Sequence, residues 1–392
     1  MLNSRIVAPA NSANQKSLKK QCNSDRSYKN EIDIISIKRA AKNLIYKSKI
    51  RKDYTLIARE ESNQSKINRV SNDWWFYDSD YKNALKLKKD LLRKFENKTI
   101  EQAIPGKVVN NIFGEYYSIE QKSESFFKKV NPEKCKNILL SDLKLLSGIG
   151  NKRERDLQER GYASIHDLMN NPTWKSQASD FINLIEKNQI DQLQSDMWRN
   201  LPKSHPLLHY LAGLANPKEF AIVDIETLGL SERPIILLGI GQIEENVVFT
   251  RQFLLRDIED EPSAIWGFVS KIEQNSSLIS YNGRSFDIPY VLQRLSYYGM
   301  EASINNPHFD LLHFTRRALK RKLRNCRLET VEQYLNIGRG INIPGALVPD
   351  FYDTYLRTGN VGPLVAIVEH NKQDLVTLAT LFSKLYEEWK IL

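Results

Sequence analysis

The spacing of apolar residues changes near Phe220. From there on, short apolar runs alternate with amphipathic segments, and this alternation predicts an α/β domain. Earlier in the chain, leucines recur at helical spacing over residues 81–97, and residues 141–170 predict helices around one tight turn. Residues 105–120 instead alternate apolar and polar positions around Asn-Asn and Gly, which predicts a small hairpin. We therefore expect a mainly helical first part with a hairpin, followed by an α/β domain.

Three segments follow from this pattern. Residues 1–35 are polar and lack hydrophobic periodicity, so they predict a disordered tail. Residues 36–216 predict the mainly helical region, with a short basic helix at 36–50, and residues 217–392 predict the α/β domain. We interpret the aromatic run at residues 74–77 as a packing anchor, and an exposed platform for stacking bases is the alternative.

Composition narrows the class of protein. The chain has 392 residues, of which 41% are hydrophobic and 10% aromatic, too many for a fully disordered chain. No apolar run approaches the ~20 residues that a membrane span needs, and the N-terminus lacks the apolar core of a secretory signal. The three cysteines are far apart and indicate neither a disulfide framework nor a zinc site. These features predict a cytoplasmic protein without a membrane partner.

Charge is distributed unevenly along the chain. The net charge is +10, but residues 1–216 carry 38 Lys and Arg against 25 Asp and Glu, whereas residues 217–392 carry 19 against 22. This asymmetry indicates a polyanionic partner for the first half. Charge alone does not distinguish DNA from RNA or from anionic lipid.

Two glycines mark the tight turn in the helical region. Gly148 and Gly150 permit backbone conformations closed to other residues, and they let amides at a helix start approach a phosphate closely. Lys152 and Arg153 follow where they can neutralise that phosphate. Residues 141–170 resemble a helix-hairpin-helix module, which implies sequence-independent binding of a nucleic-acid backbone. A hairpin used only for packing, or for a protein contact, is the alternative.

The strongest chemical signal is a pair of acids on an apolar strand. Asp224 and Glu226 are two residues apart, so their side chains point to the same face. Two adjacent carboxylates repel each other and lose hydration, and a divalent cation relieves both costs. A surface pair on an edge strand is the alternative.

Two later segments add further polar residues. Asp287 lies at a predicted helix start beside Asn282 and Phe286, where it could bind metal or simply cap the helix. Asn282 and Phe286 are candidates for nucleic-acid contact, with core packing as the alternative for Phe286. His370 and Asp374 are four residues apart on one predicted helix face. Asp374 could close a metal site, and His370 could accept a proton from water or have no such role.

A basic stretch lies between these segments. Residues 316–327 are expected to present a dense positive face at helical spacing, which would give salt-sensitive, sequence-independent contacts to phosphates. A solvated face with ion pairs is the alternative. The candidates for phosphate contact are Arg316, Arg317, Lys320 and Arg321.

The order of the acids resembles the DEDD superfamily of 3′–5′ exonucleases over residues 219–385. The motifs that carry the resemblance are Asp-x-Glu at 224–226, Asn-x-x-x-Phe-Asp at 282–287 and His-Asn-x-x-Asp at 370–374. Between these motifs, the segments HFDLL at 308–312 and CRLETVE at 326–332 resemble those of the YprB-like branch, bacterial proteins with an RNase H-like exonuclease domain.

The resemblance implies an RNase H-like fold, in which a mixed sheet of about five strands is flanked by helices. It also implies two Mg²⁺ or Mn²⁺ ions bound by four carboxylates, with His370 as general base. Asp224 would bridge the ions, and Asp287 would act partly through water. Glu226 and Asp374 would hold the ion on the side of the nucleophile.

The third motif departs from the superfamily. Its tyrosine branch places Tyr four residues before the last Asp, and its histidine branch places His five residues before. Here His370 stands at the tyrosine spacing and Glu369 at the histidine spacing, which leaves the identity of the base open.

We expect a metal-dependent 3′–5′ exonuclease that hydrolyses nucleic acid, with DNA favoured over RNA and single-stranded DNA favoured as substrate. Residues 217–392 would cut, and residues 36–216 would bind the strand. One alternative is an RNase or a structure-specific endonuclease on the same fold. The other is a nucleic-acid-binding scaffold with a degenerate nuclease site.

Overall fold

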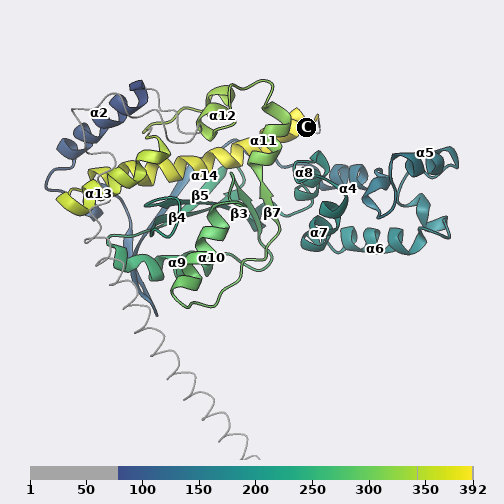
Figure 1. The fold of residues 1–392 in the computed structure, drawn as a ribbon, viewed down its shortest axis with the longest axis horizontal. Coiled ribbons are helices and arrows are strands. Elements are labelled where there is room, and N and C mark those ends of the chain that lie inside the picture. Colours follow the sequence, from purple (N-terminus) through teal and green to yellow (C-terminus); the bar gives the residue numbers. More distant parts are fainter. Residues whose placement is uncertain (1–77, 342, 391–392) are drawn as a thin grey trace, which may run out of the picture.

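The computed structural model of the chain describes residues 78–341 and 343–390 (Figure 1). The features predicted at residues 1–35, 36–50 and 74–77 lie outside these ranges. At the centre is one seven-stranded sheet with the order β1-β2-β5-β4-β3-β6-β7. The strands are β1 (Lys107–Asn111), β2 (Gly114–Glu124), β3 (Phe220–Thr227), β4 (Ile235–Glu244), β5 (Val247–Leu254), β6 (Ser277–Ser280) and β7 (His308–Asp310).

The sheet is mixed. β3 is antiparallel to β4 and parallel to β6, and β7 continues the parallel side. The five strands from β3 to β7 are those expected of the α/β domain. The predicted hairpin also forms, but its second strand pairs with β5, where Glu120 stands opposite Arg251. The hairpin therefore adds two strands to the sheet from well before Phe220 in the sequence.

Each face of the sheet is covered by helices. Along β3, Phe220 and Ile222 pack in one buried cluster with the C-terminal half of α14 (Gly362–Glu388), whereas Ala221 and Val223 pack in the other. That second cluster includes apolar residues of α9 (Glu261–Val269) and α10 (Asp287–Tyr297), which lie across the sheet from α14 in Figure 1. The period-two pattern of β3 thus places its even-numbered side chains under α14.

The remaining helices surround α14. α2 (Asp78–Lys94) confirms the helix predicted from the leucine spacing, and it packs on α14, where Leu91 joins the buried core. The other elements near the sheet are α3 (Ile100–Ala103), η5 (Ile258–Asp260), α11 (Leu311–Leu319), α12 (Leu328–Leu335), η6 (Gly345–Leu347) and α13 (Val348–Thr358).

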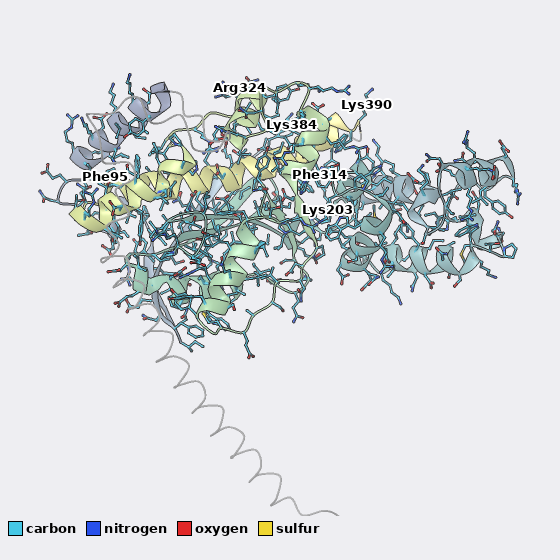
Figure 2. All side chains as sticks on the ribbon, viewed as in Figure 1. Phe95, Lys203, Phe314, Arg324, Lys384 and Lys390 are labelled. Carbon is cyan, nitrogen blue, oxygen red and sulfur yellow. The ribbon has the colours of Figure 1, made fainter. Side chains whose placement is uncertain are left out.

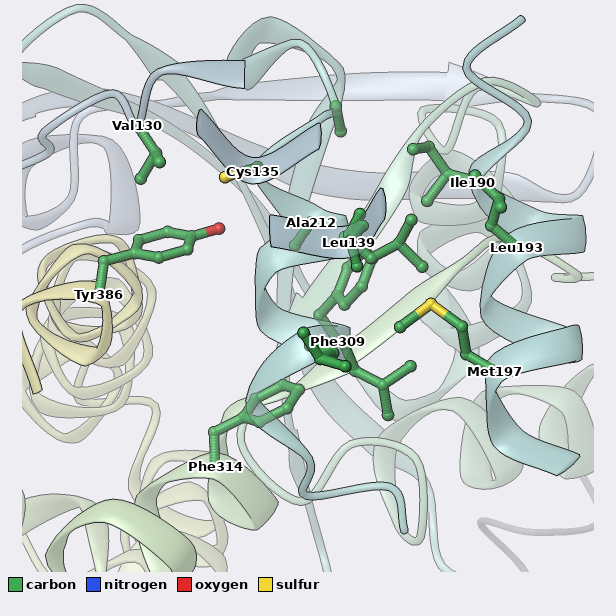
Figure 3. Close-up of a cluster of buried hydrophobic side chains, with 14 of the residues drawn as sticks. Val130, Cys135, Leu139, Ile190, Leu193, Met197, Ala212, Phe309, Phe314 and Tyr386 are labelled. Carbon is green, nitrogen blue, oxygen red and sulfur yellow. The ribbon is translucent and has the colours of Figure 1, made fainter. Parts of the chain in front are cut away.

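A helical module extends from one side of the sheet (Figure 1). Its elements are α4 (Pro132–Leu140), η2 (Leu143–Leu145), α5 (Asn151–Glu159), η3 (Asp167–Asn170), α6 (Lys175–Glu186), α7 (Ile190–Asn200) and α8 (Pro206–Ala212), and η4 (Pro217–Glu219) leads into β3. Figure 3 shows Tyr386 of α14 and Phe314 of α11 in one buried cluster with Cys135 and Leu139 of this module. The module and the sheet therefore share a continuous apolar core.

Polar contacts also join the module to the sheet. The side chain of Gln194 on α7 makes two hydrogen bonds to the backbone of His308 on the edge strand β7, at 3.3 and 3.0 Å. The Arg284 guanidinium lies 3.9 Å from the ring centroid of Trp198. Figure 2 labels Lys203 and Phe314 at this junction, and both line a small pocket there.

Among the described residues, none of the helices has the length and apolar character needed to span a bilayer.

One local prediction is wrong. Residues 316–327 do not form a single helical face, because α11 ends at Leu319. α12 begins only at Leu328, and just before it the side-chain oxygen of Asn325 accepts hydrogen bonds from the Arg327 amide at 3.0 Å and the Thr330 hydroxyl at 2.8 Å. These local contacts belong to the turn between the two helices, where the predicted helix would have continued.

Candidate active site

The paired acids on β3 lie where the strand pattern predicts. Asp224 and Glu226 both face α14, and the exposed fraction of Glu226 is 8%. Apolar neighbours that pack into the sheet flank each of them. A central strand with such neighbours is not a surface edge, so the alternative of a surface pair is wrong for these two residues.

Asp287 reaches the same region from the start of α10. Its Oδ1 atom accepts a hydrogen bond from the backbone amide of Ile225 at 3.0 Å, which ties the helix start to β3 between the two strand acids. The N-cap position of α10 is Phe286, which makes no side-chain cap. Burial raises the pKa of Asp287 to about 7. The side chain is therefore oriented by the strand.

His370 and Asp374 come from successive turns of α14. The Nε2 atom of His370 lies 3.8 Å from Oε1 of Glu226 and 3.8 Å from Oδ2 of Asp374. In the described part of the chain, potential ligand atoms of these three residues all lie within 4.8 Å of one another. Asp224 and Asp287 border this cluster. We call the five residues Asp224, Glu226, Asp287, His370 and Asp374 the acidic site.

The electrostatics of the acidic site favour a cation. Burial raises the pKa of Asp224 well above its usual range, and the neighbouring Asp374 and Glu226 charges raise it further. Burial also raises the pKa of Glu226, together with the charges of Asp374 and Asp287. Like charges in a desolvated site disfavour ionisation of one another, and a bound cation reverses that effect.

Asn371 is a site residue to which sequence reasoning gave no role. Its Nδ2 atom donates to Oδ2 of Asp224 at 2.7 Å, and its Oδ1 atom accepts from Nε2 of Gln252 at 2.8 Å. A Cβ at position 239 on β4 would collide with the same side chain, so Gly239 makes room for it. The position of Asn371 next to His370 in the third motif is the sequence feature that could have indicated its role.

Arg339 is a second residue that sequence reasoning missed. It lies in the segment after α12, and its guanidinium makes ion pairs with Asp374 and Glu332. Its Nη1 atom is 3.0 Å from Nδ1 of His370. Burial and the Arg339 charge lower the pKa of His370 to about 3. A single arginine between Gly338 and Gly340 gave no sequence signal.

Asn282 and Phe286 shape the turn before α10. Asn282 adopts a left-handed backbone conformation with φ of 70°, and its amide donates to Oδ1 of Asp310 at 2.8 Å. The Asn282 residue is exposed, whereas the Phe286 ring is half-buried and lies 5.3 Å from the ring of Tyr290. Asp310 also accepts from the amide of Leu312 and so connects this turn to the start of α11.

The glycine turn has an exposed surface. Gly148, Gly150, Lys152 and Arg153 are all exposed, and Gly148 has φ of 87°, a conformation that favours glycine. Nη1 of Arg153 donates to the Gly148 carbonyl at 2.6 Å. We call η2, this turn and α5 the glycine hairpin. It lies towards the end of the helical module that is far from the sheet (Figure 1).

The basic stretch is exposed as well. Arg316 and Arg317 occupy the last turn of α11, and Lys320 and Arg321 follow in the turn after it. α11 packs against α14, the helix that carries His370 and Asp374. Arg316 and Arg317 therefore lie on a helix that packs against the helix of His370 and Asp374.

Two comparisons with known proteins agree with this geometry. A family model described as the RNase_H superfamily matches residues 221–386, a range that contains the whole acidic site. A protein of Bacillus subtilis (strain 168), named "Uncharacterized protein YprB", is 32% identical over 200 residues. That alignment covers 47% of this chain and 46% of the relative, so it spans about half the length of each.

Proposed function

Since residues 221–386 form an RNase H-like domain in which carboxylates converge, we propose that the protein is a metal-dependent 3′–5′ exonuclease. The observation that carries the proposal is the clustering of Glu226, His370 and Asp374, with ligand atoms within 4.8 Å. Three separate elements of the fold bring acids to this point. Structural packing alone gives no reason to gather four buried or half-buried carboxylates.

The residues that would hold divalent ions are Asp224, Glu226, Asp287 and Asp374. Their donors are carboxylate oxygens, which suit Mg²⁺ or Mn²⁺. Two bound ions would supply a more acidic water and neutralise charge at the phosphodiester. Asn371 orients Asp224, and the Ile225 amide orients Asp287, so the chain itself holds two of the four carboxylates in place.

The strand of nucleic acid would be held outside the acidic site. The glycine hairpin offers exposed amides and cations at the start of α5, and Arg316 and Arg317 offer cations beside α14. Phosphate contacts of this kind give affinity without sequence preference. The resemblance of the hairpin to a helix-hairpin-helix module favours DNA over RNA in this proposal.

A second candidate is a nucleic-acid-binding scaffold without turnover. The observation that favours it is the ion pair between Arg339 and Asp374, because a cationic side chain already contacts one of the carboxylates. The scaffold would bind strands through the glycine hairpin and would not need the acidic site.

The deciding experiment incubates 5′-labelled single-stranded DNA and RNA of equal sequence with the full chain and Mg²⁺ or Mn²⁺. Asp224→Asn and EDTA are the controls. A ladder that shortens from the 3′ end, absent in both controls, supports the exonuclease, and comparison of the two strands gives the sugar preference. Internal fragments would instead indicate an endonuclease. Binding without cleavage of any strand, hairpin or duplex would favour the scaffold.

A further inference from the structure

Arg339 is buried beside the acidic site although it is not one of its acids. Only 6% of its side chain is exposed, and its guanidinium bridges α12 and α14 through Glu332 and Asp374. It comes from an irregular segment with exposed glycines on both sides. A charged side chain from such a segment stays buried only when its partners are well placed.

Glu332 anchors Arg339 and is not itself part of the acidic site. The exposed fraction of Glu332 is 2%, and its second carboxylate oxygen accepts a hydrogen bond from the Thr377 hydroxyl at 2.6 Å. Thr377 lies on α14, about one turn beyond Asp374. The guanidinium is therefore held by a partner that the metal would not use.

The contact with His370 determines where the imidazole carries its proton. An arginine side chain has only hydrogen-bond donors, so Nη1 at 3.0 Å requires that Nδ1 of His370 accept. A neutral ring must then carry its proton on Nε2. That nitrogen lies 3.8 Å from carboxylate oxygens of Glu226 and Asp374. The Arg339 contact at Nδ1 therefore selects the tautomer by itself.

We propose that Arg339 is a positioning residue that holds Asp374 and fixes His370 as the Nε2–H tautomer, so that His370 serves the site as a hydrogen-bond donor. The inference rests on the proposed nuclease function and deepens it. It replaces the general-base role expected from the sequence, because a nitrogen that already carries a proton cannot accept one from water. Asp374 keeps Oδ2 towards the site while Oδ1 is bound by Arg339.

The tautomer can be measured without any activity. The full chain labelled with ¹⁵N-histidine is studied by NMR without metal, and the His370 signals are assigned by their loss in His370→Gln. We expect protonated Nε2 and unprotonated Nδ1. In Arg339→Met, where the donor is gone, we expect Nδ1–H to become populated. A protonated Nδ1 in the unaltered protein would overturn the proposal, whatever its activity.

Kinetics separate a donor from a base. Glutamine can donate from a position near Nε2 but cannot act as a base, and alanine can do neither. We expect His370→Gln to keep cleavage within about tenfold of the unaltered protein, and His370→Ala to lose about 100-fold, as for other groups that orient a metal site. A general base would make both variants lose a similar ~10²–10⁴-fold and would change the pH profile. That result would overturn the donor role.

The role of Arg339 is tested by Arg339→Met and Arg339→Lys. We expect Arg339→Met to weaken Mn²⁺ binding by about 10–100-fold, and Arg339→Lys, which keeps a donor but loses the fork, to recover part of this. Arg357→Met is the matched control, because Arg357 is 65% exposed on α13. Unchanged or tighter Mn²⁺ binding in a folded Arg339→Met variant would overturn the positioning role. If Arg339→Met fails to fold, Arg339→Lys and the NMR measurement decide the question.

Discussion

The acidic site and the glycine hairpin are built in opposite ways. In the acidic site, the Ile225 amide holds Asp287 across 62 residues, and Asn371 holds Asp224 across 147. In the glycine hairpin, Arg153 reaches a carbonyl only five residues away, and Lys144 pairs with Glu154 ten residues away. One region therefore depends on the whole fold, whereas the other is made by a short piece of chain.

Under the proposed function, this difference should separate chemistry from binding. We expect changes in the acidic site to act on turnover or on the sheet that supports it, and to leave the hairpin surface intact. We expect changes in the hairpin to act on affinity and to leave the acidic site intact. The five predictions below test this separation from the largest expected effect to the smallest.

Asp224→Asn should reduce cleavage by about 10³-fold or more, the loss that follows removal of an essential electrostatic contact in a transition state. Strand affinity should stay within about twofold, because the hairpin is untouched. The folded state should be as stable or more stable, since a buried charge is removed while the Asn371 contact remains possible. Cleavage rates, strand affinity in EDTA and thermal melting check the three parts. A loss of strand affinity as large as the loss of cleavage would contradict the separation of chemistry from binding.

Arg294→Met should destabilise the sheet domain by about 3–5 kcal/mol, because it removes the cationic partner of a buried carboxylate. Arg294 on α10 makes two hydrogen bonds to Glu261 of α9, at 2.8 and 2.6 Å, and both side chains are almost fully buried. Arg357→Met is again the exposed control and should change the free energy of unfolding by less than about 1 kcal/mol. Urea denaturation measures both.

Asp287→Asn should make stability less dependent on pH. The pKa of Asp287 is raised to about 7 from an ordinary value of 3.8, so the folded state holds a proton that the unfolded state has lost between these values. Folding of the unaltered protein is therefore penalised increasingly as pH rises from about 4 to 7. In EDTA, the gain in unfolding free energy of Asp287→Asn over the unaltered protein should grow across that window. A difference in unfolding free energy that stays constant from about pH 4 to 7 would contradict the raised pKa of Asp287.

The two hairpin glycines should respond differently to alanine. At Gly148, with φ of 87° and Trp174 close to a new Cβ, alanine should cost about 1–2 kcal/mol of stability. At Gly150 a Cβ meets no neighbouring atom within 4 Å, so alanine should leave stability nearly unchanged. If amides at this turn contact phosphate, Gly150→Ala should still weaken strand binding several-fold. Equal binding by Gly150→Ala and the unaltered protein would remove the hairpin from the binding surface.

Lys152→Gln should have the smallest effect. A single exposed phosphate contact predicts a modest loss of affinity and a decrease of about one in the slope of log affinity against log salt concentration. Cleavage at saturating strand should be unchanged. Binding isotherms at several salt concentrations measure the slope, and an unaltered slope would show that Lys152 does not contact the strand.

The sequence predicts the carboxylates of the acidic site better than the residues and strand pairings that hold them in place. Asp224 and Glu226 follow from strand periodicity, and Asp374 follows from helical spacing, because both rules are local. Arg339 and the pairing of β2 with β5 depend on segments that meet only in the folded chain, and no local pattern reports such meetings. The single helix expected over 316–327 does not form, because the spacing of the basic residues carries no information on where α11 ends, at Leu319.

The position of β2 in the sheet also has a consequence for the order of synthesis. Glu120 of β2 pairs with Arg251 of β5, which is made 131 residues later. At ~5–20 residues per second, a ribosome takes roughly 7–26 s to reach that partner. During this interval the nascent hairpin has one strand edge without its final neighbour, and such edges are prone to wrong pairing. Slow translation between these strands should therefore increase the dependence of this protein on chaperones.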